Sequence, residues 1–193
     1  PGGDFSEPVT SHTKRFVRCL WALDRDLANS RHYPSISWID SYSEYIDDIK
    51  DWWHANVDKE WQDLRLVIME LLQKEQRLQQ VVKLVGPDVL PVTQRLVLDV
   101  CALFKNGFLQ QVSYDAVDTY SSARKQFLML KAIVTFYRKS EELVKKGIGI
   151  AELRQLPVYE ELARMKQRYT ENDLDKLERL SQKVEEALTE IEL

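Results

Sequence analysis

Apolar side chains recur at intervals of three and four residues along most of this chain, from Ser41 almost to its end. That spacing places them on one face of an α-helix, and it is typical of helices that pack around a shared core. Residues that end helices, such as Gly86-Pro87 and Gly147, separate successive stretches. The pattern predicts a mainly α fold, with a carboxy-terminal helical bundle over residues 41–193.

The apolar stripes also predict where the individual helices lie. Pro91 and Asn106-Gly107 bracket one of them, and Pro157 follows another, because neither glycine nor proline continues a helix well. The expected helices cover approximately residues 42–57, 58–85, 92–106, 117–146, 150–156 and 171–191.

Residues 1–40 follow a different pattern. Arg15 to Trp21 alternates polar and apolar side chains as a strand does, and Asp24 is placed to cap a short helix that runs through Asn29. Pro34 then favours an extended conformation at Tyr33. A single strand and a short helix cannot form a sheet core alone, so we interpret residues 1–40 as a short α/β remnant of a larger domain.

The opening segment, PGGDFSEPVTSHT, is dense in residues with special backbone conformations. A loop of this kind normally takes its shape from neighbouring structure, and no globular sequence precedes it here. We therefore expect the chain to be the back end of a longer protein.

Composition excludes several kinds of function. The net charge is −4 with both signs interspersed, which argues against a nucleic-acid partner. Cys19 and Cys101 stand in apolar surroundings, as reduced cysteines of a cytoplasmic protein do. The apolar runs are far shorter than the ~20 residues that span a bilayer, so we expect any membrane association to be indirect, through partners.

Three segments carry a resemblance to a known family: PGGDFSEPVT, FVRCLWALDRDLANSRHYPSISWIDSYSEYID and FLQQVSYDAVDTY. In this order they resemble the carboxy-terminal third of the catalytic A subunit of A-type and V-type rotary ATPases. The resemblance extends from Gly2 to about Glu171. It implies that residues 1–40 belong to the nucleotide-binding α/β domain. It also implies a parent subunit that couples ATP synthesis or hydrolysis to rotor rotation and ion transport.

The resemblance implies an adenine-binding role for Tyr33 and Tyr114, which match family positions that flank the base. Phe108 and Gln111 lie on the same connection between helices as Tyr114, and an aromatic pair beside an amide suits an adenine ring. Taken without the family, core packing is the more common role of aromatic residues in a helical domain.

The sequence contains no catalytic residue or metal site that we can assign. It has no GxxxxGK[ST] segment, and in the family the phosphate-binding loop, the catalytic glutamate and the magnesium site all lie upstream. His12, His32 and His54 are too far apart in the sequence to suggest a zinc site. We therefore expect ATP or ADP with magnesium to belong to the parent subunit, with no nucleotide bound tightly to this chain.

The turn Gly86 to Pro91 links two long predicted helices. By resemblance Pro87, Asp88, Val89 and Leu90 would contact the rotor, although only Asp88 is acidic there. The partners implied are the B subunits of a hexameric head and the central-stalk rotor subunits. The pattern alone favours a plain helical connection.

Two other interpretations remain open at this point. In one, the chain is a protein–protein interaction module that makes no nucleotide contact, and the narrow apolar seam after Thr170 would bind partner helices. In the other, it is a scaffold protein unrelated to ATPases. The adenine role predicts that Tyr33 and Tyr114 converge on one open pocket.

Overall fold

The structure is a computed structural model that describes residues 8–192. The loop predicted over residues 1–13 is wrong for residues 8–13, which form most of the short helix α1 (Pro8–Lys14). Its first seven residues lie outside the described residues. The chain divides into two compact units, Pro1–Lys59 and Glu60–Leu193, and each is described by itself. The predicted domain boundary at residue 40 falls within the first of these units.

The first unit consists of short elements around a minimal sheet. In chain order these are α1 (Pro8–Lys14), β1 (Cys19–Leu20), α2 (Arg25–Asn29), β2 (Tyr42–Ser43), the 3₁₀ helix η1 (Glu44–Ile46) and α3 (Lys50–Asn56). Strands β1 and β2 pair antiparallel, with Cys19 opposite Ser43 and Leu20 opposite Tyr42.

Local chemistry explains most of the first unit. The Asp24 carboxylate accepts hydrogen bonds from the N–H groups of Asp26 and Leu27 at 2.8 and 3.0 Å, which confirms the predicted cap of α2. The predicted strand over residues 15–21 is reduced to Cys19–Leu20. The predicted start of a helix at Tyr42 is wrong, because Tyr42 pairs in β2 and its hydroxyl donates to the carbonyls of Lys14 and Val17.

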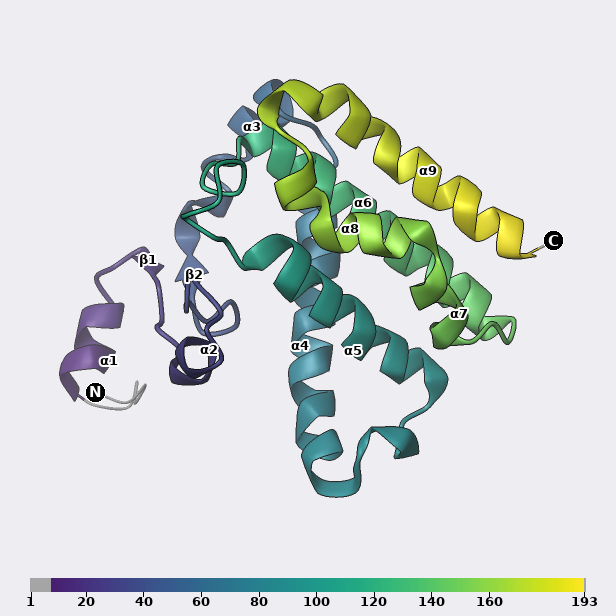
Figure 1. Cartoon of the computed structure of the whole chain (residues 1–193). Coiled ribbons are helices and arrows are strands. Elements are labelled where there is room, and N and C mark those ends of the chain that lie inside the picture. Colours follow the sequence, from purple (N-terminus) through teal and green to yellow (C-terminus); the bar gives the residue numbers. More distant parts are fainter. Residues whose placement is uncertain (1–7, 193) are drawn as a thin grey trace. The chain divides into compact units, whose positions relative to one another are not determined.

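The second unit is a helical bundle (Figure 1). Its elements are α4 (Trp61–Val85), the 3₁₀ helix η2 (Pro87–Val89), α5 (Val92–Phe104), the π-helical turn η3 (Lys105–Leu109), α6 (Ala123–Lys145), α7 (Ile150–Gln155), α8 (Pro157–Arg168), the 3₁₀ helix η4 (Glu171–Asp173) and α9 (Leu174–Glu192). Helix α6 is central, because α4, α5, α8 and α9 all pack against it.

Special residues end or begin several of these helices. Gly86 and Gly147 follow α4 and α6 with φ angles of 83° and 102°, which side chains other than glycine adopt only with strain. Pro157 starts α8 at a position where the missing N–H costs nothing. Helix α6 begins at Ala123 rather than near residue 117, because the Ser122 hydroxyl accepts from the N–H of Lys125 and caps it there.

Most of the core of the second unit comes from the apolar stripes that the sequence predicts, but part of it comes from α8, a helix that was not predicted. The fully buried members of this core include Leu71, Leu72, Leu96, Val100, Phe127, Ile133, Leu162, Met165, Leu177 and Leu180. Together with the two-stranded sheet, this confirms the mainly α fold class. None of the helices in residues 8–192 combines the length and the apolar character needed to cross a membrane.

The apolar seam of α9 packs inside this unit. Leu177, Leu180, Val184 and Leu188 are buried where α9 lies against α6. The interpretation of the chain as an interaction module needs this seam to be free to bind partner helices. Within the chain, α6 already covers the seam.

Candidate functional site

Tyr33 lies in the first unit, in a loop whose two ends are joined. The N–H of Asp24 donates to the carbonyl of Ser35 at 2.9 Å, and the N–H of His32 donates to the carbonyl of Leu27 at 2.9 Å. The ring of Tyr33 is exposed. A short, closed loop therefore presents this aromatic side chain to solvent.

Phe108 lies in the second unit, within the π-helical turn η3. Its ring stacks on Phe104, with centroids 4.8 Å apart and planes inclined by 16°. The neighbouring Gly107 lies against helix α8, where an added Cβ would come within 3.1 Å of the carbonyl oxygen of Leu162. This close approach holds the turn, and with it Phe108, against α8.

Asp118 organises the connection that follows Phe108. Its carboxylate accepts from the N–H of Val112 at 2.8 Å, and its carbonyl accepts from the side-chain amide of Gln111 at 2.8 Å. The Asp115 carboxylate accepts from the N–H groups of Val117 and Asp118. These bonds close a compact loop, and Tyr114 lies on it with 99% of its surface exposed.

A buried lysine holds this loop to the bundle, and a second buried lysine contacts the helix that carries the first. Lys166, on α8, donates to the carbonyl of Gln110, and its ammonium lies 3.6 Å from the Asp118 carboxylate. Lys125, on α6, is only 1% exposed and donates to the carbonyl of Lys166 at 2.9 Å. Burial lowers the pKa of both lysines, against the opposing charge of nearby carboxylates, among them Asp118.

Neither buried lysine was among the residues predicted from the sequence, although a signal for them exists. Lys125 precedes the buried Met129 by four residues, and Lys166 follows the buried Leu162 by four. Each lysine therefore stands on the apolar stripe of its helix. A cation in such a position is placed to meet a buried partner.

The residues predicted to contact the rotor lie on the turn that follows the C-terminal end of α4 (Figure 1). The buried apolar residues of α4 lie in its N-terminal half. Pro87, Asp88 and Val89 are exposed, whereas Leu90 is buried, so the Leu90 side chain is not part of the turn's outer surface. Exposed apolar side chains surround this turn: Val81, Leu84, Val85 and Val92.

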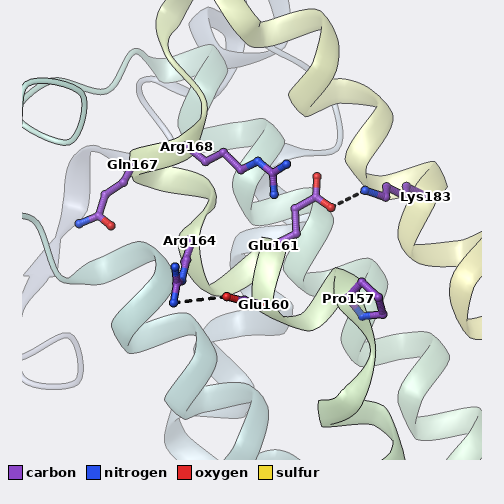
Figure 2. Close-up of a pocket in the computed structure, with 7 residues that line it drawn as sticks. All are labelled: Pro157, Glu160, Glu161, Arg164, Gln167, Arg168 and Lys183. Atoms are coloured by element: carbon purple, nitrogen blue, oxygen red, sulfur yellow. Dashed lines mark hydrogen bonds and ion pairs between the residues drawn. The ribbon is translucent and has the colours of Figure 1, made fainter.

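A surface pocket of about 670 Å³ lies beside α8 and α9 (Figure 2). Glu160 pairs with Arg164 at 3.3 Å, and Glu161 pairs with Lys183 at 2.5 Å. Burial opposes the charge of Glu161, but hydrogen bonds from Lys183 and the Tyr169 hydroxyl outweigh it and hold the pKa of this carboxyl below its ordinary value. None of the seven residues drawn at this pocket is aromatic, so it offers no ring on which adenine could stack.

The described residues suit only part of a nucleotide. In the first unit Tyr33 has an exposed ring, and in the second unit Tyr114 has an exposed ring and Gln111 an amide oxygen of the kind that accepts from the amino group of adenine. No group of three or more His, Cys, Asp or Glu side chains in the described part of the chain is arranged to hold a metal ion. Phosphate and magnesium would need residues other than these.

Two family comparisons match the chain. Residues 50–154 match the "C-terminal domain of V and A type ATP synthase". Residues 1–43 match the "ATP synthase alpha/beta family, nucleotide-binding domain". The first match covers more than half of the chain, and the second covers the segment interpreted above as a remnant of an α/β domain.

Individual relatives align along almost the whole chain. The V-type ATP synthase alpha chain of Halothermothrix orenii is 48% identical over 96% of this chain and 32% of its own length. The A subunit of the A-type ATP synthase of Pyrococcus abyssi is 48% identical over 99% of this chain and 18% of its own length. The A subunit of the A-type ATP synthase of Methanopyrus kandleri is 45% identical over 99% of this chain and 32% of its own length. The chain thus spans a third or less of these relatives.

A solved structure shares the fold. It is titled a unique ATP synthase subunit NeqB from Nanoarcheaum equitans, and it matches with a TM-score of 0.58 at 21% identity, over 71% of this chain and 32% of that one. At this identity the likeness concerns the fold alone. The domain match and the aligned relatives go further: the chain belongs to the V- and A-type ATP synthase family, as the C-terminal domain of the A subunit.

Proposed function

We propose that the chain is the C-terminal part of a catalytic A subunit that couples ATP synthesis or hydrolysis to rotor rotation and ion transport. The observation that carries this proposal is the alignment of 99% of the chain with the A subunits of A-type ATP synthases at 45–48% identity. No comparable agreement supports an interaction module or an unrelated scaffold.

Within that subunit, the chain contributes one wall of the adenine pocket. Tyr33 and Tyr114 stack against the base, Phe108 backs the pocket, and Gln111 accepts from the amino group of adenine. The exposure of Tyr33 and Tyr114 supports this role, because a stacking ring must be free to meet the base. Magnesium and the phosphates of ATP or ADP are held by the upstream part of the subunit.

The helical bundle serves as the lever of the same subunit. Nucleotide binding moves the bundle, and the turn at Pro87, Asp88 and Val89 presses on the central-stalk rotor. In the hexameric head, B subunits alternate with copies of this one. The complex holds it at the cytoplasmic side of the membrane, which it reaches only through its partners.

This division of labour predicts that the 193-residue chain alone has no ATPase activity. Phosphoryl transfer depends on positioned phosphates and on charge stabilisation, and this sequence contains no phosphate-binding loop to provide them. A steady-state ATPase assay on the purified chain should give background turnover. Activity that co-purifies with the chain through further columns would refute the assignment.

The adenine wall is tested in the complete A subunit, within its assembled complex. Tyr114→Ala should weaken the binding of ATP and ADP by the same factor, since both carry the base, and stacking on one aromatic ring is worth about 1–3 kcal/mol. Equilibrium dissociation constants measure the loss. Tyr120→Ala is the matched control, because Tyr120 is another exposed tyrosine of the same connection. Unchanged dissociation constants for Tyr114→Ala would exclude the contact.

A further inference from the structure

A polar hub, made of Asp118 from the connection between η3 and α6, Lys166 from α8 and Lys125 from α6, is not explained by the adenine contact alone. All three residues are buried, although burying charged groups costs several kcal/mol unless each one is paired. Apolar side chains would pack more cheaply at these positions. The charges therefore need a reason beyond the stability of the bundle.

The partners of the hub are three consecutive residues of the loop. The carbonyl of Gln110 accepts from Lys166, the side chain of Gln111 donates to the carbonyl of Asp118, and the N–H of Val112 donates to the Asp118 carboxylate. Tyr114 follows two residues later. Because its ring is almost fully exposed, the position of Tyr114 depends on these backbone anchors rather than on packing of the ring.

Helix α8 positions both aromatic residues of this segment. Phe108 is fixed through the close approach of Gly107 to Leu162 and Ala163, and the loop that carries Tyr114 is fixed through Lys166. All three of these α8 residues lie within five positions of one another. The separation of Phe108 and Tyr114 is thus set by one rigid element.

We infer that Lys166 and Asp118 are positioning residues for nucleotide binding, which hold Tyr114 and Gln111 in the geometry that receives the adenine base. This inference rests on the proposed adenine contact. Its physical basis is preorganisation: a loop that is already ordered loses less conformational freedom when the ligand binds. A buried ion pair fits this task, because backbone carbonyl and N–H groups need polar partners when they are buried.

The test uses the complete A subunit in its assembled complex, with Lys166→Met and Asp118→Asn as alternative disruptions of the hub. Each should weaken the binding of ATP and ADP about fivefold, the scale of coupling between contacting residues. The affinity for inorganic tripolyphosphate, which has no base, should stay unchanged. In a Tyr114→Ala background neither variant should cause a further loss, because the group that they position is gone.

Glu161→Gln is the matched control. Glu161 is a buried, ion-paired residue of the same helix, but its partners are Lys183 and Tyr169 rather than the loop. It should lower the melting temperature without changing the dissociation constant of ATP. If Lys166→Met prevents assembly, Asp118→Asn decides the question alone, because it removes the charge that faces Lys166 while keeping the size of the side chain.

The possible outcomes separate the two proposals. The positioning role is wrong, while the adenine wall stands, if Tyr114→Ala weakens ATP binding and the hub variants do not. The same conclusion follows if the loss caused by a hub variant adds to the loss caused by Tyr114→Ala. Equal losses for ATP and tripolyphosphate would also overturn positioning. If Tyr114→Ala has no effect, the adenine contact fails and the positioning role fails with it.

Discussion

Buried charges in the bundle each join two elements. Glu75 on α4 pairs with Lys105 of η3 at 2.8 Å, and Glu161 on α8 pairs with Lys183 on α9. Asp99 on α5 accepts from the guanidinium of Arg154 on α7. Since an unpaired buried charge is costly, such pairs disfavour arrangements of the helices that would separate the partners.

The Asp99–Arg154 pair allows the cost of leaving a buried charge without its partner to be measured. The Asp99 side chain is 3% exposed, and besides Arg154 it accepts only a 3.3 Å bond from Tyr159 among the bonds described. Arg154→Ala should therefore lower the free energy of unfolding of the chain by about 2 kcal/mol. This loss is smaller than that expected for a pair in which both partners are buried, because Arg154 is itself 58% exposed. Urea unfolding followed by circular dichroism measures the change.

Arg164→Ala provides the comparison for that experiment. Arg164 pairs with Glu160 at the surface, where both partners are largely exposed, so its loss should cost less than about 0.5 kcal/mol. Equal losses for Arg154→Ala and Arg164→Ala would show that the burial of Asp99 has no energetic consequence.

At the residue scale, sequence reasoning succeeded where the cause was local. The cap at Asp24 depends on residues two and three positions away, and the structure confirms it. The buried Lys125 and Lys166 were missed because their partners lie on other elements: Lys125 reaches α8, and Lys166 reaches the loop at Gln110 and Asp118. The adenine roles of Tyr33 and Tyr114 remain predictions that came from the family, and those of Phe108 and Gln111 remain predictions that came from their place on the same connection as Tyr114.

Among the elements, most long periodic helices were predictable, whereas several of their beginnings and the whole of α8 were not. The stripes of α4 and α5 run through the core as expected, and Gly86 ends α4. Tyr42 instead joins a strand. Its partner Leu20 lies 22 residues earlier, so the local pattern of side chains around Tyr42 could not reveal the pairing. The start of α6 shifted to Ala123, because the Asp115 and Asp118 carboxylates hold the preceding segment in turns.

The turn between α4 and α5 carries a prediction about coupling in the assembled complex. Pro87 and Pro91 restrict its backbone, and Leu84 beside it is 85% exposed, so the contact with the rotor should depend on a stiff apolar shape. Replacing residues 87–91 by a Gly/Ser segment should reduce the ATP-driven ion transport per ATP hydrolysed, with the affinity for nucleotide unchanged. Asp88→Ala should leave this ratio intact.

Crosslinking gives the direct measurement for the same turn. A cysteine at Val89, which is exposed at the tip, should form a disulfide with a cysteine on the central stalk in at least one rotary state. If no crosslink forms while a reference cysteine pair on the stalk reacts, the turn plays no part in transmission.

At the scale of the whole molecule, the two units differ in how much they bury. In the first unit, Ala22, His32 and Ser37 are the buried residues among those described, and helices α1, α2 and α3 contribute none. Large apolar side chains there remain exposed: Phe16, Trp21, Leu23 and Trp52. In the proposed subunit the remainder of the α/β domain covers such surfaces, whereas the second unit has a core of its own.

This contrast predicts very different local stabilities in the isolated chain. Amide exchange at residues 14–22 should be at least about 100-fold faster than at residues 120–140, because few apolar contacts oppose local opening of a two-residue strand pair, whereas α6 is packed on four helices. Exchange measured by mass spectrometry on a chain shown to be monomeric by sedimentation makes the comparison. The same residues 14–22 should become protected in the complete A subunit, where the rest of the sheet is present. Equal protection of the two segments in the monomer would mean that the first unit is stable without those partners, and that its exposed aromatic side chains need another explanation.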